Sequence, residues 1–448
     1  MPNSEKKSHR YNLQNTVKTV SNEDDIVVLV KKAHREQQNI RVIGSRNSAQ
    51  VYRIAPSNAN SFVQIELEDN YDNVLNIDQE NKRITIQSGM RQGKLISILK
   101  KYQWALNSIN GSHLITVGGA IATGSFSASK FSYGDAILSL RIIEADGNII
   151  TVNRNHCNFG AYLCSNGLLG VISEITLQCV EEYSVRGKSS IVDFETMISL
   201  RDEDNLHFLE DWDYMICEWY PYIKKVVCRR SAQIPKLKSN ESNEISSVGP
   251  SESYFGQLLT IIGGVFLLTN KVVISSYLKY LGTEFGDGFW GDRICADPKL
   301  SSTFHPIDYL EVVIPHRHYV AYMTDLREYY EKHPERMPYG PVISDWIISD
   351  KHSWIGKNSH DKDEWFAAIT FMRQQVEKKT AAYIFEGPVA LAKKYDTRMH
   401  WGKNPWMDKK EDVAKTLPKG NLERFSKLRK EKDPQGLFLN DFFKKVFL

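Results

Sequence analysis

The sequence lacks an excess of charge of either sign. Its 57 Lys and Arg residues nearly balance its 54 Asp and Glu residues, which leaves a formal net charge of +3 over 448 residues. Proteins that bind nucleic acid or an anionic membrane through their overall field carry a stronger basic excess. We therefore expect neither nucleic acid nor a membrane surface among the partners of this chain.

Cysteine is scarce and forms no metal-binding pattern. The six cysteines include no CxxC pair, which zinc fingers and dithiol redox centres require. We interpret them as buried free thiols of a protein in a reducing compartment. His316-Arg317-His318 has no nearby set of carboxylates or thiols to complete a metal site, so we expect solvated loop residues there and no metal.

No hydrophobic run is long enough for a membrane span. The apolar segment at 258–269 has 12 residues, whereas a spanning helix needs about 20. We expect a buried helix or a pair of strands there, with a membrane-dipping face as the alternative. The polar residues 1–15 are not followed by the apolar run of a secretory signal. Cytoplasmic localisation is therefore the expectation.

The sequence does contain alternating helix and strand patterns over its first 180 residues. A helix is predicted at 22–35, since Ile26 and Val30 lie on one apolar face. Asp146-Gly147 between two apolar runs predicts a hairpin. The other elements predicted in this part are strands at 39–43, 62–67 and 83–87 and a helix at 92–102.

Length and pattern together predict an α+β fold with more than one domain. A chain of 448 residues is too long for one ordinary core, and interleaved helices and strands exclude an all-helical fold. The central third contains strand-like pieces such as 309–315 and is predicted to form a second α+β domain. Residues 232–252 are rich in Ser, Asn, Glu, Lys and Pro, which predicts a mobile loop.

A predicted strand leads directly into a small polar turn that spans 44–48. A bound diphosphate needs several backbone N–H donors at close approach, and small residues such as Gly44, Ser45 and Ser48 permit that approach. Arg46 could add positive charge. A generic strand-to-loop turn would look the same, so both interpretations stay open for this segment alone.

A second stretch, at 115–125, holds Gly118, Gly119 and Gly124 with only small residues between them. Without bulky side chains, a flat ring and a pyrophosphate could lie against its main-chain amides. The spacing is neither GxGxxG nor a P-loop, so a nicotinamide dinucleotide fold is not indicated. A close-packed turn is the alternative.

Together these motifs resemble the vanillyl-alcohol-oxidase superfamily with its PCMH-type FAD-binding domain. They resemble most closely the sugar-1,4-lactone oxidases, which include gulonolactone-, galactonolactone- and D-arabinono-1,4-lactone-oxidising enzymes. The resemblance covers nearly the whole chain. It is carried by 43–48 (IGSRNS), 117–124 (VGGAIATG), 167–172 (GLLGVI), 218–222 (EWYPY), 310–315 (LEVVIP), 400–403 (HWGK) and 433–438 (DPQGLF).

The resemblance implies three parts: a two-subdomain FAD-binding domain at 1–180, an α+β cap on the substrate side at 181–395, and a segment at 396–448 that returns to the flavin. It implies FAD with its diphosphate between the two loops and its adenine near Gly170. The residues expected to contact this cofactor are Ile43, Gly44, Ser45, Arg46, Asn47, Ser48, Val117, Gly118, Gly119, Ala122, Thr123, Gly124, Ser125, Gly170, Val171, Ile172, His400 and Lys403.

The sequence departs from the family pattern at three places. The family often bonds its flavin covalently through a His at the position of Asn47, and an amide cannot make that bond, so we expect non-covalent FAD. Where the family usually has Gly-Thr-His-Gly, this chain has Gly-Ser-Phe-Ser at 124–127. Lactone-oxidising members carry Glu-x-Arg in a cap strand, where this chain has Ile343 and Asp345. That change removes a charged pair that would grip sugar hydroxyls.

The chemistry expected of such a site is oxidation of a CH–OH group, with hydride transfer to flavin N5. His400 is the expected base, because an imidazole titrates near neutral pH, and Lys403 is expected to stabilise developing negative charge. Glu311 is a further candidate that faces either the core or the substrate. We expect a small-molecule substrate and O2 or another electron acceptor. The alternatives are an oxidase or dehydrogenase of a non-sugar alcohol or amine, and a flavin-binding partner subunit without turnover.

Overall fold

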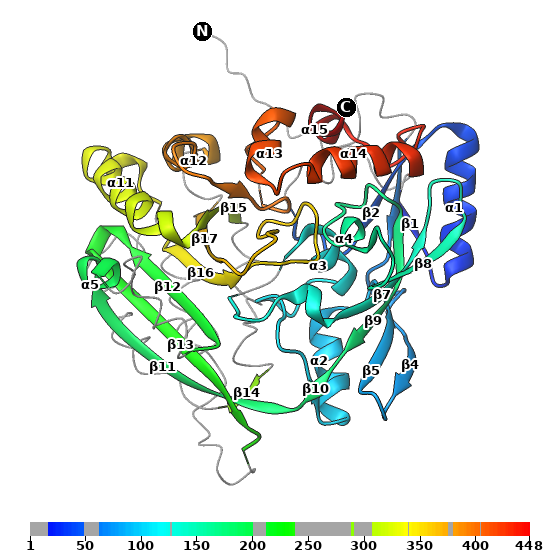
Figure 1. Ribbon diagram of the computed structural model, residues 1–448, viewed down its shortest axis with the longest axis horizontal. Coiled ribbons are helices and arrows are strands. Elements are labelled where there is room, and N and C mark those ends of the chain that lie inside the picture. The colour runs from blue at the N-terminus through cyan, green and yellow to red at the C-terminus, as the bar shows by residue number, and fades with distance from the viewer. Residues whose placement is uncertain are drawn as a thin grey trace.

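The N-terminal part of the chain forms two main sheets (Figure 1). The computed structural model describes residues 17–48, 62–125, 128–199, 212–237, 288–290, 307–338, 340–374, 380–403 and 405–448. A parallel sheet has the order β1–β3–β2, with bounds Val17–Thr19, Phe62–Glu66 and Asn39–Ile43. An antiparallel sheet has the order β4–β5–β9–β7–β8, with bounds Val74–Asp78, Arg83–Gln87, Val171–Gln178, Ile137–Ile143 and Ile149–Asn153. A short pair joins β6 (Trp104–Ala105) to β10 (Val180–Glu181).

Local signals explain the helices and turns of this part. The side chain of Asn22 accepts from the amide of Asp25 and caps α1 (Glu23–Glu36), which buries Ile26 and Val30. Gly147 adopts φ 81° in the turn between β7 and β8, as the predicted hairpin requires. The other helices here are α2 (Gln92–Lys101), α3 (Val117–Thr123), η4 (Tyr133–Ala136) and α4 (Phe159–Tyr162). The predicted helices and hairpin are confirmed.

The second part is built on one large antiparallel sheet. Its strand order is β14–β11–β13–β12–β16–β17–β15–β18. In chain order the bounds are β11 Tyr183–Asp193, β12 Tyr214–Tyr220, β13 Lys225–Pro235, β14 Gly288–Phe289, β15 Ile307–Pro315, β16 Val342–Ile348, β17 Trp365–Gln374 and β18 Arg398–Met399. The α+β prediction is confirmed.

The two faces of the large sheet differ in character, because side chains alternate along each strand. On β15, Leu310 and Val312 belong to an apolar core with α5, α11 and α12, whereas Glu311 points to the opposite face. Figure 1 shows these helices on the outer side of the sheet and the N-terminal part on its other side. The helical elements of this part are α5 (Phe194–Ser199), η5 (Pro221–Ile223), η6 (His316–His318), α11 (Tyr319–Lys332), η7 (Pro334–Arg336) and α12 (Ala381–Ala392).

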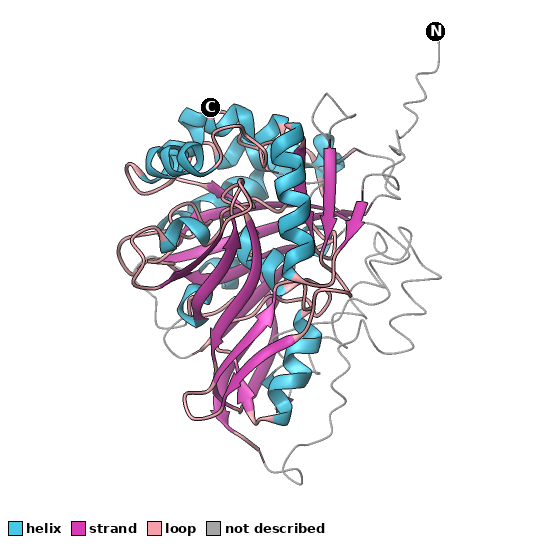
Figure 2. Ribbon diagram, turned by 90° about the vertical axis from the view of Figure 1, so that its right-hand side faces the viewer, coloured by secondary structure: helices cyan, strands magenta, loops and turns pink. Residues whose placement is uncertain are grey.

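The C-terminal helices pack on the N-terminal part. Figures 1 and 2 both show them at one end of the molecule, beside the C-terminus. They are α13 (Lys410–Thr416), α14 (Asn421–Lys432) and α15 (Asp441–Phe447). Phe425 and Phe443 are buried in the same core as Leu95 of α2 and Leu140 of β7. The end of the chain thereby completes the core that its beginning started.

Some expectations concern residues beyond the described part of the chain. Of the predicted loop at 232–252, residues up to Pro235 belong to β13 instead, because they pair with β11 as far as Tyr183. Residues 238–252 and the apolar segment at 258–269 lie outside the described residues. Within the described ranges, no helix is long and apolar enough to cross a membrane. The five cysteines described are free thiols, of which four are buried as expected and Cys157 is exposed, and Cys295 lies outside.

Asn39 fastens the C-terminal turn to β2. Its Nδ2 donates to the carbonyls of Gly436 (2.9 Å), Leu437 (3.2 Å) and Leu439 (3.1 Å). Asn39→Ala leaves partly buried carbonyls without this donor, so we expect a destabilisation of about 1–3 kcal/mol, measured as a lower thermal midpoint. Asn148→Ala is the matched control, since the Asn148 side chain donates to Asp146 in an exposed turn. Equal shifts in the two variants would contradict this role of Asn39.

Candidate active site

The turn after β2 presents backbone N–H groups that the protein leaves unused. Among the described residues, the amides of Ser45, Arg46 and Asn47 donate to no protein acceptor. Arg46 has a left-handed backbone with φ 59°, and such a residue turns successive N–H groups toward one side, where they form a concavity for an anion. This turn fits the diphosphate of FAD.

The side chains of the same turn contribute less than the sequence suggested. The guanidinium of Arg46 lies 2.7 Å from the Glu66 carboxylate, so its charge is already engaged. Asn47 is exposed, and its Nδ2 lies 3.4 Å from the Ser45 hydroxyl. The contact of the Arg46 side chain with a diphosphate stays a prediction, and its backbone amide is available as well.

The second glycine-rich stretch is a helix, α3, and the predicted open loop is wrong. Thr116 caps its start, and Gly124 ends it in the left-handed conformation with φ 62°. The amides of Val117 and Gly118 donate to the carbonyls of Met90 and Ser88. Those amides are not free for a pyrophosphate, which leaves the turn at 45–47 as the donor set.

The glycines of this region serve different purposes. A Cβ on Gly44 would overlap the Thr116 hydroxyl, and a Cβ on Gly118 would lie 2.7 Å from Ser88 Cβ. These two glycines allow the two segments to pack on the protein itself. Gly119 is exposed, and a Cβ there would lie 2.8 Å from Thr116 Oγ1 and within 4 Å of no other described atom. The bare backbone at Gly119 suits a flat ring.

The third predicted cofactor segment is used mainly for packing. A Cβ on Gly170 would lie 2.5 Å from the Ile143 carbonyl oxygen. The side chains of Val171 and Ile172 belong to two buried cores. Ile43 is buried as well, and Ala122 is half-buried. The contacts of these residues with FAD stay a prediction.

The C-terminal motif meets both N-terminal segments. His400 Nε2 lies 3.0 Å from Ser125 Oγ, which lies 2.9 Å from Thr123 Oγ1. A Cβ on Gly402 would lie 3.5 Å from Ser48 Oγ. The structure therefore brings together the turn at 44–48, the end of α3 and the segment at 400–403, as the resemblance implied.

The hydrogen bonds around His400 assign its tautomer. Thr123 donates to the Gly119 carbonyl (2.9 Å), so Ser125 donates to Thr123 and accepts from His400 Nε2–H. The other ring nitrogen, Nδ1, accepts from the Gly402 amide at 2.8 Å. Burial lowers the pKa of His400 well below its ordinary value, so the ring is neutral. Both ring nitrogens are engaged within the protein.

Glu311 is the centre of a buried ionic cluster. Its carboxylate accepts from Lys357 Nζ at 2.8 Å, from Lys403 Nζ at 2.5 Å and from Thr370 Oγ1 at 3.1 Å. Burial alone would raise the pKa of Glu311, but the charges of Lys357 and Lys403 outweigh it and hold the pKa well below its ordinary value. Glu311 is therefore an ionised anchor that faces the site, which answers the open question of its orientation.

Strand register places further side chains beside Glu311. One row of paired residues crosses four neighbouring strands of the sheet. It runs from Glu311 of β15 through Thr370 of β17 and Ile343 of β16 to Glu218 of β12. In the next row of the same face, Asp345 lies between Ala368 and Ile216. Sequence analysis missed Lys357 and Thr370. The alternation on β17 could have placed Thr370 on this face, whereas no sequence pattern marked Lys357.

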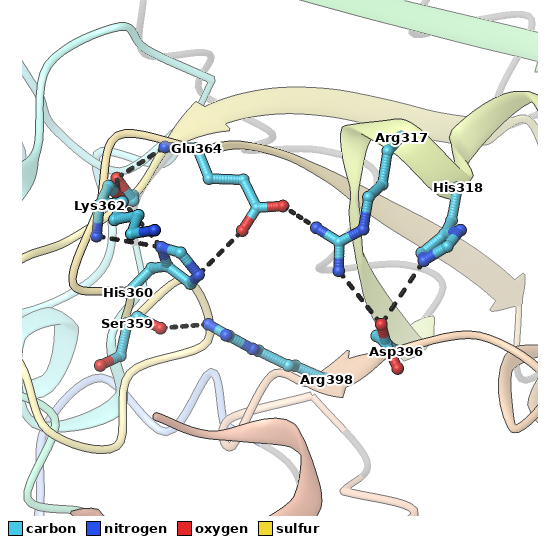
Figure 3. A network of polar contacts seen from close by, with 9 residues as sticks. Arg317, His318, Ser359, His360, Lys362, Glu364, Asp396 and Arg398 are labelled. Atoms are coloured by element: carbon cyan, nitrogen blue, oxygen red, sulfur yellow. Dashed lines mark hydrogen bonds and ion pairs between the residues drawn. The ribbon is translucent and has the colours of Figure 1, made fainter. Parts of the chain in front are cut away.

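A second polar network holds the strand that leads into His400 (Figure 3). Arg317 forms ion pairs with Glu364 and Asp396, and His360 Nε2 lies 3.1 Å from Glu364. Arg398 of β18 donates to the Ser359 carbonyl. These contacts fasten β18 to the loop that follows β16 and thereby fix the start of the segment at 400–403.

The predicted solvated loop at 316–318 is wrong for one of its residues. His316 is buried, and its Nδ1 accepts from Trp346 Nε1 at 3.2 Å. Arg317 is exposed and His318 lies 3.5 Å from Asp396. In the part of the chain that the structure describes, no group of three or more His, Cys, Asp or Glu side chains could hold a metal ion.

Comparisons with known proteins agree with this geometry. Residues 15–153 match the FAD binding domain family, and residues 175–446 match the family described as D-arabinono-1,4-lactone oxidase. The chain is 24% identical over 388 residues to L-gulonolactone oxidase of Mus musculus, covering 84% of this chain and 83% of that protein. It is 28% identical over 257 residues to D-arabinono-1,4-lactone oxidase of Candida glabrata, covering 54% and 46%.

Solved structures share the fold at low sequence identity. A cholesterol oxidase from B. sterolicum superposes with a TM-score of 0.78 at 14% identity and covers 96% of this chain and 94% of its own. A solvent-stable cholesterol oxidase superposes with a TM-score of 0.75 at 15% identity, covering 96% and 95%. This likeness establishes the architecture and leaves the substrate to the side chains of the site.

Gly119 gives the first test of cofactor placement. Gly119→Val puts a branched side chain on the bare backbone of α3, so we expect FAD to be lost on gel filtration while the apo-protein stays folded. Gly119→Ala is the milder companion and should retain most of the flavin. The measurement is the flavin-to-protein absorbance ratio, with far-ultraviolet circular dichroism for the fold. Full flavin content in Gly119→Val would show that FAD does not lie against α3.

Asn47 gives a second test, of how the flavin is held. An amide cannot form the covalent link to flavin that an imidazole forms, so FAD should be released when the protein is denatured. Acid precipitation should leave the yellow colour in the supernatant, measured by its absorbance. Flavin that stays on the washed pellet would contradict non-covalent binding.

Proposed function

The chain belongs to the D-arabinono-1,4-lactone oxidase family of FAD-dependent oxidoreductases, and from this premise we propose that it oxidises a small alcohol by transfer of a hydride to the flavin. The observation that carries the proposal is the meeting of three segments at one place. Ser48, Ser125 and His400 are brought together there. The Glu311–Lys403 ion pair joins the same C-terminal segment to the large sheet.

When bound, FAD supplies the two-electron acceptor for this oxidation. The protein supplies binding, orientation and charge. The amides at 45–47 would hold the diphosphate, and the exposed backbone at Gly119 would face the flat part of the cofactor. Lys357 and Lys403 both donate to Glu311, and the ammonium of Lys403 could stabilise a developing alkoxide or reduced flavin.

We assign His400 a positioning role in place of the role of base that its residue type suggested. Its Nδ1 lone pair is directed to the Gly402 amide and its Nε2 proton to Ser125. It could accept a proton only after the bond to Gly402 broke. The neutral ring instead fixes the segment that carries Lys403 against the end of α3.

The substrate side favours a non-sugar alcohol. Ile343 lies in the row between Thr370 and Glu218, and the family resemblance makes it the counterpart of the glutamate that grips sugar hydroxyls in lactone-oxidising members. Asp345 stands where those relatives have an arginine. The two changes replace a charge-paired clamp with an apolar side chain and a hydrogen-bond acceptor.

The chain is an enzyme, so the alternative of a flavin-binding subunit without turnover is set aside. Cytoplasmic localisation and the choice between O2 and another acceptor stay predictions.

The altered clamp predicts poor oxidation of aldonolactones. Each lost charged hydrogen bond to a substrate hydroxyl weakens the binding of the transition state by about 2–4 kcal/mol. This loss lowers the rate of oxidation on the order of tens- to several-hundred-fold. Millimolar gulono- or galactono-1,4-lactone should therefore bleach the flavin at close to the background rate in anaerobic stopped-flow. Dithionite, which should bleach it fully, is the control for a competent flavin. Rapid bleaching by either lactone would show that Ile343 and Asp345 do not occupy the clamp positions.

A further inference from the structure

The carboxylate of Asp345 has no partner within the described protein. It lies in the middle of β16, between Ala368 of β17 and Ile216 of β12. Its Oδ1 is buried, and the side chain forms no hydrogen bond or ion pair with any described residue. Asp345 as a whole is half-buried, but a carboxylate oxygen that is buried without a partner is destabilising, which makes Asp345 a candidate for a functional residue.

The charged groups that face Asp345 are already matched with one another. Lys403 and Lys357 both donate to Glu311, and Glu218 accepts from Arg229 at 2.7 Å. Burial raises the pKa of Asp345 to about 6; Lys403 and Lys357 oppose the rise, and Glu311 and Glu218 add to it. A carboxylate with such a pKa is ionised at neutral pH and still basic enough to take a proton.

We propose that Asp345 is the catalytic residue that accepts the hydroxyl proton of the substrate, and that the substrate is a neutral alcohol with apolar substituents. This inference rests on the proposed function and deepens it. The hydroxyl donates to Asp345, while half-buried Ile343 and Ile216 on the same face contact the apolar part. A charged or densely hydroxylated substrate would leave polar groups without partners against these side chains.

The step balances as an alcohol oxidation. The O–H bond breaks and its proton passes to Asp345. The C–H bond breaks and its hydrogen leaves with both electrons as a hydride to the flavin, while a C=O bond forms. Lys403 lies close enough to act on the charge of Asp345 and stabilises the alkoxide as it develops.

The other two acceptors at this site are unsuited to the task. His400 has both ring nitrogens engaged, with Ser125 and Gly402. Glu311 accepts from two lysines and a threonine hydroxyl, which hold it ionised and fully bonded. Asp345 is the group among these three whose lone pairs are not used within the described protein.

The test compares Asp345→Asn with Asp308→Asn in the FAD-loaded protein. Asp308 lies on the same sheet but pairs with Arg373 at 2.6 Å, so it is a matched control for loss of a carboxylate. The probes are benzyl alcohol, cyclohexanol and 2-phenylethanol, mixed anaerobically between pH 4.5 and 8.5, with flavin bleaching as the readout. Because the base must be ionised, the wild-type rate should rise with pH through about 6 and then level off.

We expect Asp345→Asn to lower this rate by about 10²–10⁴-fold and to abolish its rise with pH, a range typical of losing a general base. Asp308→Asn should keep both the rate, within about threefold, and the pH profile. If wild type is bleached and Asp345→Asn shows the same rate and the same pH profile, the role of Asp345 as the base is overturned. The proposed alcohol oxidation is not affected by that result. No bleaching of wild type by any of the three alcohols would refute the proposed alcohol oxidation, and the role of base with it.

A second readout does not depend on turnover. The folded-state pKa of Asp345 is raised from 3.8 to about 6, so its stability contribution is fully present below pH 3.8 and is lost as the pH rises through 6. The thermal midpoint of Asp345→Asn should therefore increase relative to wild type between pH 4 and pH 7. Asp308→Asn, which loses an ion pair, should show no such gain. A pH-independent difference for Asp345→Asn would mean that folding does not raise the pKa of this carboxylate, and a difference that falls with pH would mean that a partner stabilises its charge; either result would overturn the proposal.

Discussion

The buried carboxylate of Glu311 is the constraint on which the site depends. It is 1% exposed and receives Lys357 from the loop after β16, Lys403 from the C-terminal segment and Thr370 from β17. Removing one partner from a buried ion pair leaves an uncompensated charge and is strongly destabilising, by about 3–5 kcal/mol. One side chain of β15 therefore holds together the loop after β16, the following strand β17 and the distant C-terminal segment.

The connection continues into the N-terminal part through hydrogen bonds of fixed direction. Lys403 and His400 belong to the same short segment, and His400 donates through Ser125 and Thr123 toward the Gly119 carbonyl. A shift of the large sheet would be transmitted through Glu311 and Lys403 to the end of α3. The same residues thus position the segments proposed for the cofactor relative to the sheet face proposed for the substrate, as the proposed hydride transfer requires.

Much of the fold could be predicted from the sequence, because its signals are local. Helix α1 follows from Asn22 and the spacing of Ile26 and Val30, and the β7–β8 hairpin follows from Asp146-Gly147. Helix α3 was mistaken for a loop because its glycines outweighed the capping signals of Thr116 and Gly124 at its two ends. The meeting of the turn at 44–48 with 400–403 came from family motifs, since nothing local to either segment indicates the other.

The details of the site depend on pairings between distant residues, which periodicity does not reveal. The parallel pairing of β2 and β3 puts Ile43 opposite Glu66. Arg46 lies in the turn that follows Ile43, so its guanidinium can form an ion pair with Glu66. The tautomer of His400 depends on Thr123, Ser125 and Gly402 acting together. Glu311 was recognised as a candidate, but its lysine partner at position 357 lies 46 residues away on a loop without a motif.

The two sides of the site tolerate change to different degrees, for a physical reason. On the cofactor side, Gly44 and Gly118 approach Thr116 and Ser88 so closely that a single added methyl group would clash. On the substrate side, Ile343 and Asp345 are half-buried positions of a sheet face whose backbone pairing does not depend on their side chains. Substitutions there change the polarity of the substrate face while Glu311, Lys357 and Lys403 keep the frame intact. Side chains of β16 on the sheet face proposed for the substrate could therefore change without rebuilding the fold.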